Sequence, residues 1–258
     1  MEIEIDLSKT IEENSTHYFQ QSKLARRKIE GIKKAIVAQN LEQMKKEKVK
    51  EKAIERKRKW FEKFRWFYTS NNFLVVGGKD AHLNEELVKK HMDKRDIYFH
   101  AEVFGAPHCV IKLAETKKNA VDDVSMSEAA EFAVTFSKAW EEGRAQADAY
   151  SVKPEQVSKT AQPGEHLGTG AFMIYGERNW FKKAKLTCAI GFFEKEKTLM
   201  CGPVSAIKKH CKFVIELKQG SKSKEEVGKE LKQIFESKGC FFSVDNFVSL
   251  LPNGNFSF

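Results

Sequence analysis

The chain changes character at Trp60-Phe61-Glu62-Lys63-Phe64-Arg65-Trp66-Phe67-Tyr68, where six of nine residues are aromatic. The residues before this stretch are mostly charged, and those after it alternate between apolar runs and turns. Rings gathered this densely predict a core that forms where a helix enters a globular domain. We therefore predict two parts: residues 1–58 form an extended arm, and residues 59–258 form a compact domain.

The arm is predicted to begin with a short strand and to continue as one long helix. Residues 2–7 read Glu-Ile-Glu-Ile-Asp-Leu, and this period of two is typical of a strand. Ser8 or Thr10 then offers an N-cap, and acidic residues occupy the first helical turn. From there to about Arg58 the chain has no proline, so the helix is expected to run through.

A thin apolar stripe follows this helix. Ile29, Ile32 and Ile36 keep a spacing of three and four residues, and Tyr18 and Ala25 precede them in the same stripe. A stripe this narrow does not stabilise a helix alone, because helical stability in proteins comes mostly from packing. We expect a partner helix, supplied by another chain or by a segment absent from this sequence.

The chain is basic, with 45 Lys and Arg against 36 Asp and Glu and a net charge of +9. Between Lys45 and Lys59, nine basic residues stand against three glutamates, which places +6 within fifteen residues. A charge run is often only the solvated face of a helix, but so one-sided an excess favours a polyanion such as RNA. The candidate phosphate contacts here are Lys45, Lys46, Lys48, Lys50, Arg56 and Arg58.

The second part mixes strands and helices without regular alternation. Apolar runs predict strands at 73–76, 96–100, 109–113, 171–175, 186–193, 199–201 and 213–217. Helical periodicity predicts helices at 84–92, 128–146 and 224–236. Strands outnumber helices and no βαβ rhythm is present, which indicates an α+β domain.

Several classes of protein are disfavoured by what the sequence lacks. No apolar stretch reaches eighteen residues, and the acidic N-terminus does not resemble a signal peptide. The five cysteines are odd in number and lack CxxC spacing, which argues against a disulfide framework or a zinc site. We expect a cytoplasmic protein with reduced thiols, no cofactor and no membrane partner.

A glycine-rich loop, Gly164-Glu165-His166-Leu167-Gly168-Thr169-Gly170, offers backbone N–H groups to a phosphate. It is neither a P-loop nor a dinucleotide fingerprint, because no Lys-Ser/Thr follows it and a strand is predicted next. The competing interpretation is a tight turn that needs positive φ angles. Gly168, Thr169 and Gly170 are candidate contacts with an RNA backbone.

His100 and His108 flank a turn, near Asp96. Metal ligation or acid–base catalysis uses such groups, but a satisfied polar cluster or a binding surface fits the pattern too. Asp80 and Glu85 lack the Asp-x-Asp or Glu-x-Lys spacing of nucleases, and no nucleophile motif is present. We expect no catalytic and no metal-binding residue, and we keep both histidines as candidate RNA contacts.

Arg178 lies in a predicted turn, Gly176-Glu177-Arg178-Asn179-Trp180-Phe181-Lys182-Lys183. Arginine beside aromatic rings commonly holds unstacked bases and phosphates. The alternative is a basic hairpin tip without a ligand. Arg178, Lys182 and Lys183 are therefore candidate RNA contacts.

Long motifs occur along the chain in a distinctive order: Lys59 to Phe67, Gly77-Gly78-Lys79-Asp80-Ala81, Asp96 to Glu102 running into Gly105-Ala106-Pro107, and Gln156 to Ala161 leading to Gly164 to Ile174. Together they resemble the C-terminal half of the NFACT family, the NEMF/RqcH-type ribosome quality-control proteins, and are closest to an archaeal member. Residues 5–58 resemble the returning arm of the family's middle coiled coil, and residues 59–258 its NFACT-R domain. Lys79 and Lys159 join the candidate RNA contacts because they lie in these motifs.

The resemblance implies a non-catalytic, RNA-binding module. Family members bind the large ribosomal subunit after a stalled ribosome splits, with peptidyl-tRNA still aboard, and recruit aminoacyl-tRNA for C-terminal tailing of the nascent chain. The family's N-terminal domain is absent here, so tRNA selection by that domain does not carry over. The expected partners are large-subunit rRNA, tRNA, and a partner coiled-coil helix or N-terminal NFACT segment.

Two other functions stay open. The thin stripe of the arm fits a coiled-coil interaction protein whose C-terminal domain binds protein or DNA without a ribosomal role. A nuclease that uses Asp80, Glu85 or Asp96 is the remaining hypothesis, which metal-dependent cleavage of RNA would reveal.

Overall fold

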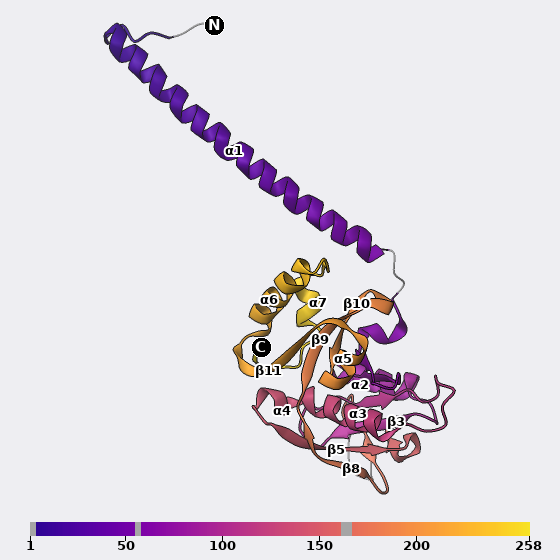
Figure 1. The fold of residues 1–258 in the computed structure, drawn as a ribbon. Coiled ribbons are helices and arrows are strands. Elements are labelled where there is room, and N and C mark those ends of the chain that lie inside the picture. The colour runs from indigo at the N-terminus through magenta and orange to yellow at the C-terminus, as the bar shows by residue number, and fades with distance from the viewer. Residues whose placement is uncertain (1–3, 55–57, 161–166) are drawn as a thin grey trace. The chain divides into compact units, whose positions relative to one another are not determined.

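The computed structural model describes residues 4–54, 58–160 and 167–258, with side chains described for 4–36, 58–160 and 167–258. The chain divides into two units, residues 1–57 and 58–258, whose elements Figure 1 labels. In the first unit, helix α1 (Ile11–Ile54) runs for 44 residues without interruption, which confirms the predicted long helix. At a rise of ~1.5 Å per residue it is roughly 66 Å long.

Thr10 sets the start of α1. Its hydroxyl accepts a hydrogen bond from the Glu13 N–H at 3.2 Å, and the Glu13 carboxylate accepts one from the Thr10 N–H at 2.8 Å. The strand predicted for residues 2–7 is wrong over its described part, because residues 4–7 form no strand and Ile5 and Leu7 are exposed. A strand needs a neighbour for its backbone hydrogen bonds, and no described strand pairs with these residues.

The stripe of α1 is open in this unit. Ile29, Ile32 and Ile36 are 52%, 59% and 50% exposed, so the described residues supply no packing partner for them. Apolar side chains on a long, regular helix are typical of a surface that pairs with another helix. The expectation of a partner helix therefore keeps its physical basis.

The second unit is built on a six-stranded antiparallel sheet in the order β1-β2-β4-β3-β5-β8. Its strands are β1 (Arg65–Tyr68), β2 (Leu74–Gly77), β3 (Ile97–Ala101), β4 (Cys109–Ile111), β5 (Gln146–Val152) and β8 (Asn179–Lys185). Helix α3 (Asp123–Thr135) packs along β3, β5 and β8 (Figure 1). On that face Phe99 and Phe181 meet with ring centroids 5.6 Å apart in the main core.

The opposite face of this sheet carries a second, smaller apolar cluster. Val88, Tyr98, Tyr150 and Val152 are buried there. Successive residues of a strand point to opposite faces, so Tyr98 faces away from Phe99 and α3. The cover comes from the π-helical turn η2 (Leu87–His91), which continues α2 (Ala81–Glu86), and from the paired strands β6 (Val157–Ser158) and β7 (Met173–Ile174).

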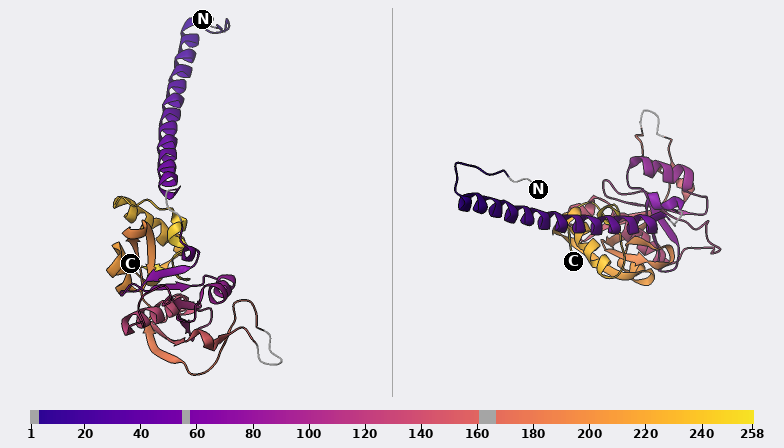
Figure 2. Two further views of the ribbon diagram at one scale, coloured as in Figure 1. Left: turned by 90° about the vertical axis from the view of Figure 1, so that its right-hand side faces the viewer. Right: turned by 90° about the horizontal axis from the view of Figure 1, so that it is seen from above.

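A second sheet of four strands completes this unit, in the order β10-β9-β11-β12. Its strands are β9 (Cys188–Phe193), β10 (Thr198–Gly202), β11 (Lys212–Lys222) and β12 (Phe256–Ser257). Three helices accompany it, α5 (Val204–His210), α6 (Lys224–Ser237) and α7 (Val244–Val248). Figure 2 shows the C-terminal end of the chain at this sheet. The α+β class expected from the sequence is confirmed.

The aromatic stretch packs as predicted. It forms the 3₁₀ turn η1 (Trp60–Lys63) followed by β1, and Phe61, Phe64, Trp66 and Phe67 are buried. Two further 3₁₀ turns, η3 (Pro154–Gln156) and η4 (Glu194–Glu196), connect strands. The junction is therefore part of the main core, as the density of rings indicated.

The helix predicted for 128–146 is wrong at both ends. The Asp122 carboxylate accepts a hydrogen bond from the Ser125 N–H at 3.0 Å, so α3 already begins at Asp123. The Ser137 hydroxyl caps a separate short helix, α4 (Lys138–Glu141), and the chain then enters β5. The strand predicted at 171–175 shortens to the two residues of β7.

Candidate nucleic-acid interface

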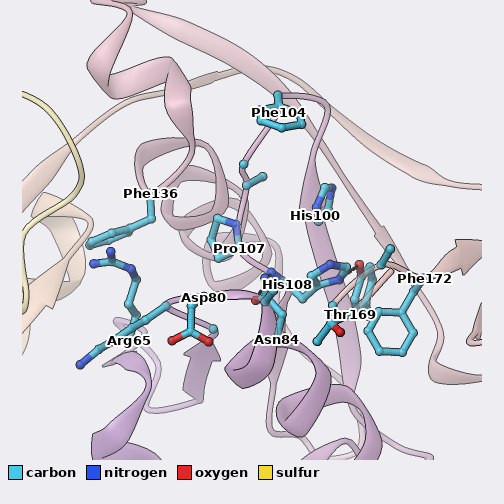
Figure 3. A pocket seen from close by; sticks show the side chains of 18 of the residues that line it. Arg65, Asp80, Asn84, His100, Phe104, Pro107, His108, Phe136, Thr169 and Phe172 are labelled. Atoms are coloured by element: carbon cyan, nitrogen blue, oxygen red, sulfur yellow. Dashed lines mark hydrogen bonds between the residues drawn. The ribbon is translucent and has the colours of Figure 1, made fainter. Parts of the chain in front are cut away.

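A pocket of about 540 Å³ lies where β1, β3, β5 and three loops meet. The loops follow β2, connect β3 to β4, and precede β7. Figure 3 shows Arg65 and Phe136 at one end of the pocket and Thr169 and Phe172 at the other. A cavity of this size is within the range that takes a small organic ligand.

Two histidines form part of the pocket wall. The Tyr98 hydroxyl is hydrogen-bonded to Nδ1 of His108, and the His100 ring lies 4.8 Å from the His108 ring. Burial lowers the pKa of His108 to about 3 and that of His100 to about 4. Both rings are therefore neutral at pH 7, and they shape and polarise the pocket without adding positive charge to it.

The described end of the glycine-rich loop is tied to the domain by Glu85 and Lys159. The Gly170 N–H donates to Glu85 Oε2 at 2.8 Å, and Lys159 Nζ donates to the Gly168 carbonyl at 2.8 Å and pairs with Glu85 at 3.1 Å. Hydrogen bonds from Lys89, Gly170 and Lys159 lower the pKa of Glu85 to about 2.

This arrangement favours a structural turn at Gly170. Its φ angle is +77°, and a Cβ there would lie 2.6 Å from the carbonyl oxygen of Ala81. The Gly170 N–H and the Lys159 ammonium already have partners within the domain. Thr169 is exposed and lines the pocket, whereas Gly164 to His166 lie outside the described residues.

A row of rings crosses three strands beside the pocket. His100 stands opposite Tyr150, and Tyr150 opposite Trp180, in the antiparallel register of β3, β5 and β8. Residues directly opposite one another point to the same face of a sheet. Ring centroids are 6.0 Å apart for His100 and Tyr150 and 5.4 Å for Tyr150 and Trp180. Because Trp180 is 39% exposed, the row reaches solvent at β8.

Arg178 covers this row. Its guanidinium carbon lies 4.6 Å from the centroid of the Tyr150 ring and 5.7 Å from that of Trp180. Glu102 is its ion-pair partner at a loose 3.6 Å. The Lys182 ammonium lies 4.0 Å from the Trp180 ring. An arginine, a lysine and the exposed Trp180 ring thus converge on one surface, a combination that suits contact with single-stranded nucleic acid.

The hairpin-tip interpretation of this segment is wrong, because Asn179–Lys185 form the edge strand β8. Lys183 has a φ angle of +55° and donates its N–H to Asp148 at 2.8 Å, where the pairing of β5 and β8 shifts register. Lys182 pairs with Asp148 as well, at 2.8 Å. The strand depends on pairing with β5, a strand that the sequence analysis did not predict.

The remaining predicted RNA contacts lie in different parts of the structure. Lys79 is partly buried and lines the pocket, and burial, followed by the charge of Arg65, lowers its pKa. Arg58 is exposed. The backbone positions of Lys45, Lys46, Lys48 and Lys50 lie in α1, but their side chains, like the whole of Arg56, fall outside the described residues. The pocket thus brings together Lys79, His100, His108, Thr169 and Gly170.

The three carboxylates of the nuclease hypothesis each have a structural partner. Asp80 accepts the Leu83 N–H at 2.9 Å and caps α2, and Asp96 receives the buried Lys112 ammonium at 2.5 Å. Glu85 holds the turn at Gly170. Among the residues that the structure describes, no group of three His, Cys, Asp or Glu side chains is arranged to hold a metal ion.

Three residues of this surface escaped the sequence analysis as candidate contacts: Arg65, Phe104 and Tyr150. Arg65 had a signal, since it is a lone arginine between buried aromatic residues. Tyr150 belongs to β5, a strand that the apolar pattern did not predict, and Phe104 is a solitary ring in a loop. Pairing and loop geometry, rather than local pattern, bring the last two to the pocket.

Residues 63–176 match the family model described as the NFACT protein RNA binding domain. The chain is 43% identical over 206 residues to the archaeal Rqc2 homolog aRqcH of Methanocaldococcus jannaschii, covering 79% of this chain and 30% of that protein. It is 35% identical over 201 residues to the ribosome quality control complex subunit NEMF homolog of Drosophila melanogaster (75% and 20%). It is 36% identical over 192 residues to the human subunit NEMF (70% and 17%).

The chain therefore spans only 17% to 30% of the length of these relatives. The matched domain contains the strands and loops that form most of the pocket wall. No helix in the described ranges is both long and apolar enough to cross a membrane. The shared RNA-binding domain, together with these relatives, shows that the chain belongs to the NFACT family.

Proposed function

We propose that this chain is a non-catalytic, RNA-binding module of a cytoplasmic ribosome quality-control factor. It binds the large ribosomal subunit that carries peptidyl-tRNA after stalling, and it supports tRNA recruitment for C-terminal tailing of the nascent chain. Residues 1–58 act as one arm of a coiled coil, and residues 59–258 as the RNA-binding domain. The description of the matched domain and the names of the relatives support this setting.

The observation that carries the proposal is the surface formed by Tyr150, Arg178 and Trp180. Arg178 lies over the Tyr150 ring, and Trp180 is exposed next to it. Unstacked bases pack on aromatic rings and guanidinium planes, while nearby lysines neutralise phosphates. Lys182 and Lys183 are both exposed on the same strand, where an RNA backbone would pass.

The arm contributes in a different way. Lys45, Lys46, Lys48 and Lys50 fall within α1, a long helix that carries them as a block of positive charge in the sequence. A long helix with such a block offers a row of cations to rRNA phosphates, and the exposed isoleucines are the seam for the partner helix.

RNA binding by the domain is tested with fluorescent single-stranded rRNA fragments titrated at several salt concentrations. Reversing Arg178 and Lys182 together to Glu should weaken binding and flatten the plot of log K against log salt by roughly 1.4, about 0.7 for each phosphate that is no longer neutralised. Lys212→Glu is the matched control for the lysine, because Lys212 is 59% exposed and paired to a glutamate at 2.9 Å, against 61% and 2.8 Å for Lys182. Equal losses in the double variant and the control would refute a specific surface.

The ribosomal role is tested by co-sedimentation with large subunits. Reversing Lys45, Lys46, Lys48 and Lys50 to Glu should abolish binding while the unfolding transition of the domain stays unchanged. Unchanged co-sedimentation would overturn the role of the arm. Two measurements test the alternative, a coiled-coil interaction protein without a ribosomal role: competition among rRNA, tRNA and duplex DNA for binding, and light scattering for the oligomeric state. A preference for duplex DNA, or a dimer without RNA affinity, would favour that alternative.

A further inference from the structure

Arg65 is a buried cation that has no anionic partner among the residues whose side chains the structure describes. Its side chain lies at one end of the pocket and is only 9% exposed, and burial lowers its pKa. It donates one hydrogen bond, to the Leu251 carbonyl at 3.1 Å, and forms no ion pair with any carboxylate among the described residues. Burying a charge in this way is costly unless something compensates it.

Two lysines add to the positive charge around Arg65. Lys224 Nζ donates to the same Leu251 carbonyl at 3.3 Å and to Asn253 at 2.9 Å. Burial and then the charge of Arg65 lower the pKa of Lys224 and of Lys79. The charge of Arg65 therefore repels both lysines, of which Lys79 also lines the pocket, and an anion bound beside Arg65 and Lys79 would relieve part of the repulsion.

The guanidinium is held so that its edge remains available. The Phe136 ring covers it, with 4.5 Å between the guanidinium carbon and the ring centroid (Figure 3). A guanidinium has five N–H donors in its plane, of which the Leu251 carbonyl takes one. Two parallel N–H groups match two oxygens of a phosphate. Asp80 also lines the pocket, but it caps α2 and is not paired with Arg65.

Phe104 supplies an apolar platform in the same pocket. It is 80% exposed, and the Lys138 ammonium lies 4.6 Å from its ring centroid. Gly105 follows with a φ angle of +69°, which turns the loop so that the ring projects from the fold. Packing within the domain does not explain so exposed a ring, whereas a nucleobase stacks on such a surface.

We propose that this pocket takes a single unpaired nucleotide of RNA, with its phosphate against Arg65 and Lys79 and its base stacked on Phe104. The inference rests on the proposed RNA-binding function and adds the form in which RNA enters the site. A duplex does not fit a cavity of about 540 Å³, so the nucleotide must leave any helix before it binds.

The test is a titration of the whole chain with the four nucleoside 5′-monophosphates, followed by NMR or calorimetry. We expect saturable binding, at least tenfold tighter than that of the nucleosides or of inorganic phosphate. Phe104→Ala should weaken it by about 5- to 150-fold, the range for removal of one base stack. Phe258→Ala is the matched control, since Phe258 is 48% exposed and carries a lysine 5.2 Å from its ring.

Lys79→Met should weaken nucleotide binding and lower its salt dependence by roughly 0.7. Lys182→Glu is expected to weaken binding of longer RNA but to leave binding of the mononucleotides unchanged, because Lys182 does not line the pocket. The inference is overturned, and RNA binding upheld, if oligonucleotides bind through Lys182 while no mononucleotide does. It is likewise overturned if inorganic phosphate binds as tightly as the nucleotides, or if Phe104→Ala has no more effect than Phe258→Ala. If no RNA binds at all, the proposed RNA-binding function is itself refuted.

Discussion

Acidification from pH 7.5 to pH 5 is expected to destabilise the RNA-binding domain through His100 and His108. In the folded state burial holds their pKa values at about 4 and about 3, whereas the unfolded chain restores a value of about 6.5. Between about pH 6.5 and the folded-state pKa values, the unfolded state therefore binds more protons than the folded state. Stability therefore falls as the pH drops from there towards the folded-state values.

The size of the effect follows from linkage. At pH 5 an unfolded histidine is almost fully protonated, about 1.5 pH units below its pKa, while both folded histidines remain mostly neutral. One unit corresponds to about 1.36 kcal/mol, so each histidine costs about 2 kcal/mol and the pair about 4 kcal/mol. This is a large share of the ~5–15 kcal/mol that stabilises a typical domain.

The measurement is the free energy of unfolding in urea between pH 8 and pH 5, followed by tryptophan fluorescence of the whole chain. The variant His100→Gln/His108→Gln keeps a neutral polar side chain at both positions and should lose about 4 kcal/mol less over that range than the unaltered chain. His100→Gln alone should recover about half of the difference. Parallel pH profiles for the chain and the double variant would refute the reasoning, because the loss would then come from other groups.

Further outcomes concern the turn at Gly170 and a helix cap. Gly170→Ala should cost about 1–3 kcal/mol in urea unfolding, because of the positive φ angle and the clash with the Ala81 carbonyl, whereas Gly168→Ala, with open space around it, should change little. In the unaltered chain the Gly170 N–H donates to the Glu85 carboxylate, so Glu85→Gln should speed hydrogen exchange of the Gly170 amide. An unchanged exchange rate would contradict the role of Glu85 in holding this turn. Ser223→Ala removes a capping box of α6 and should cost about 1 kcal/mol by the same unfolding assay.

Local signals predicted a good part of this fold. Thr10 caps α1 as its side chain suggested, and the aromatic rings around Phe64 form the core at the junction. The strands near Val75, Phe99 and Ile190 lie within short apolar runs whose burial is visible in the sequence. In each case the information lies within a few neighbouring residues.

The features that could not be predicted from the sequence depend on contacts between distant segments. β5 has no apolar run that predicts a strand, and it forms because β3 and β8 pair with it on either side. Gly170 looks like a phosphate contact until Glu85, 85 positions earlier, takes its N–H. Arg65 looks like one more charge in the sequence, and only the fold buries it beside Phe136, where no carboxylate of the described part of the chain pairs with it.

The position of β8 has a consequence for solubility. It is the last strand of its sheet, and an edge with free backbone groups invites unwanted pairing with strands of other molecules. Lys182 and Lys185 place exposed charges on this edge, and the positive φ angle of Lys183 bends it. Lys182, which is proposed to hold RNA, thus also limits self-association of the chain. Neutral substitutions of these lysines could cause aggregation, which would be mistaken for weaker RNA binding. Charge reversal keeps a charge on the edge strand and so avoids this ambiguity.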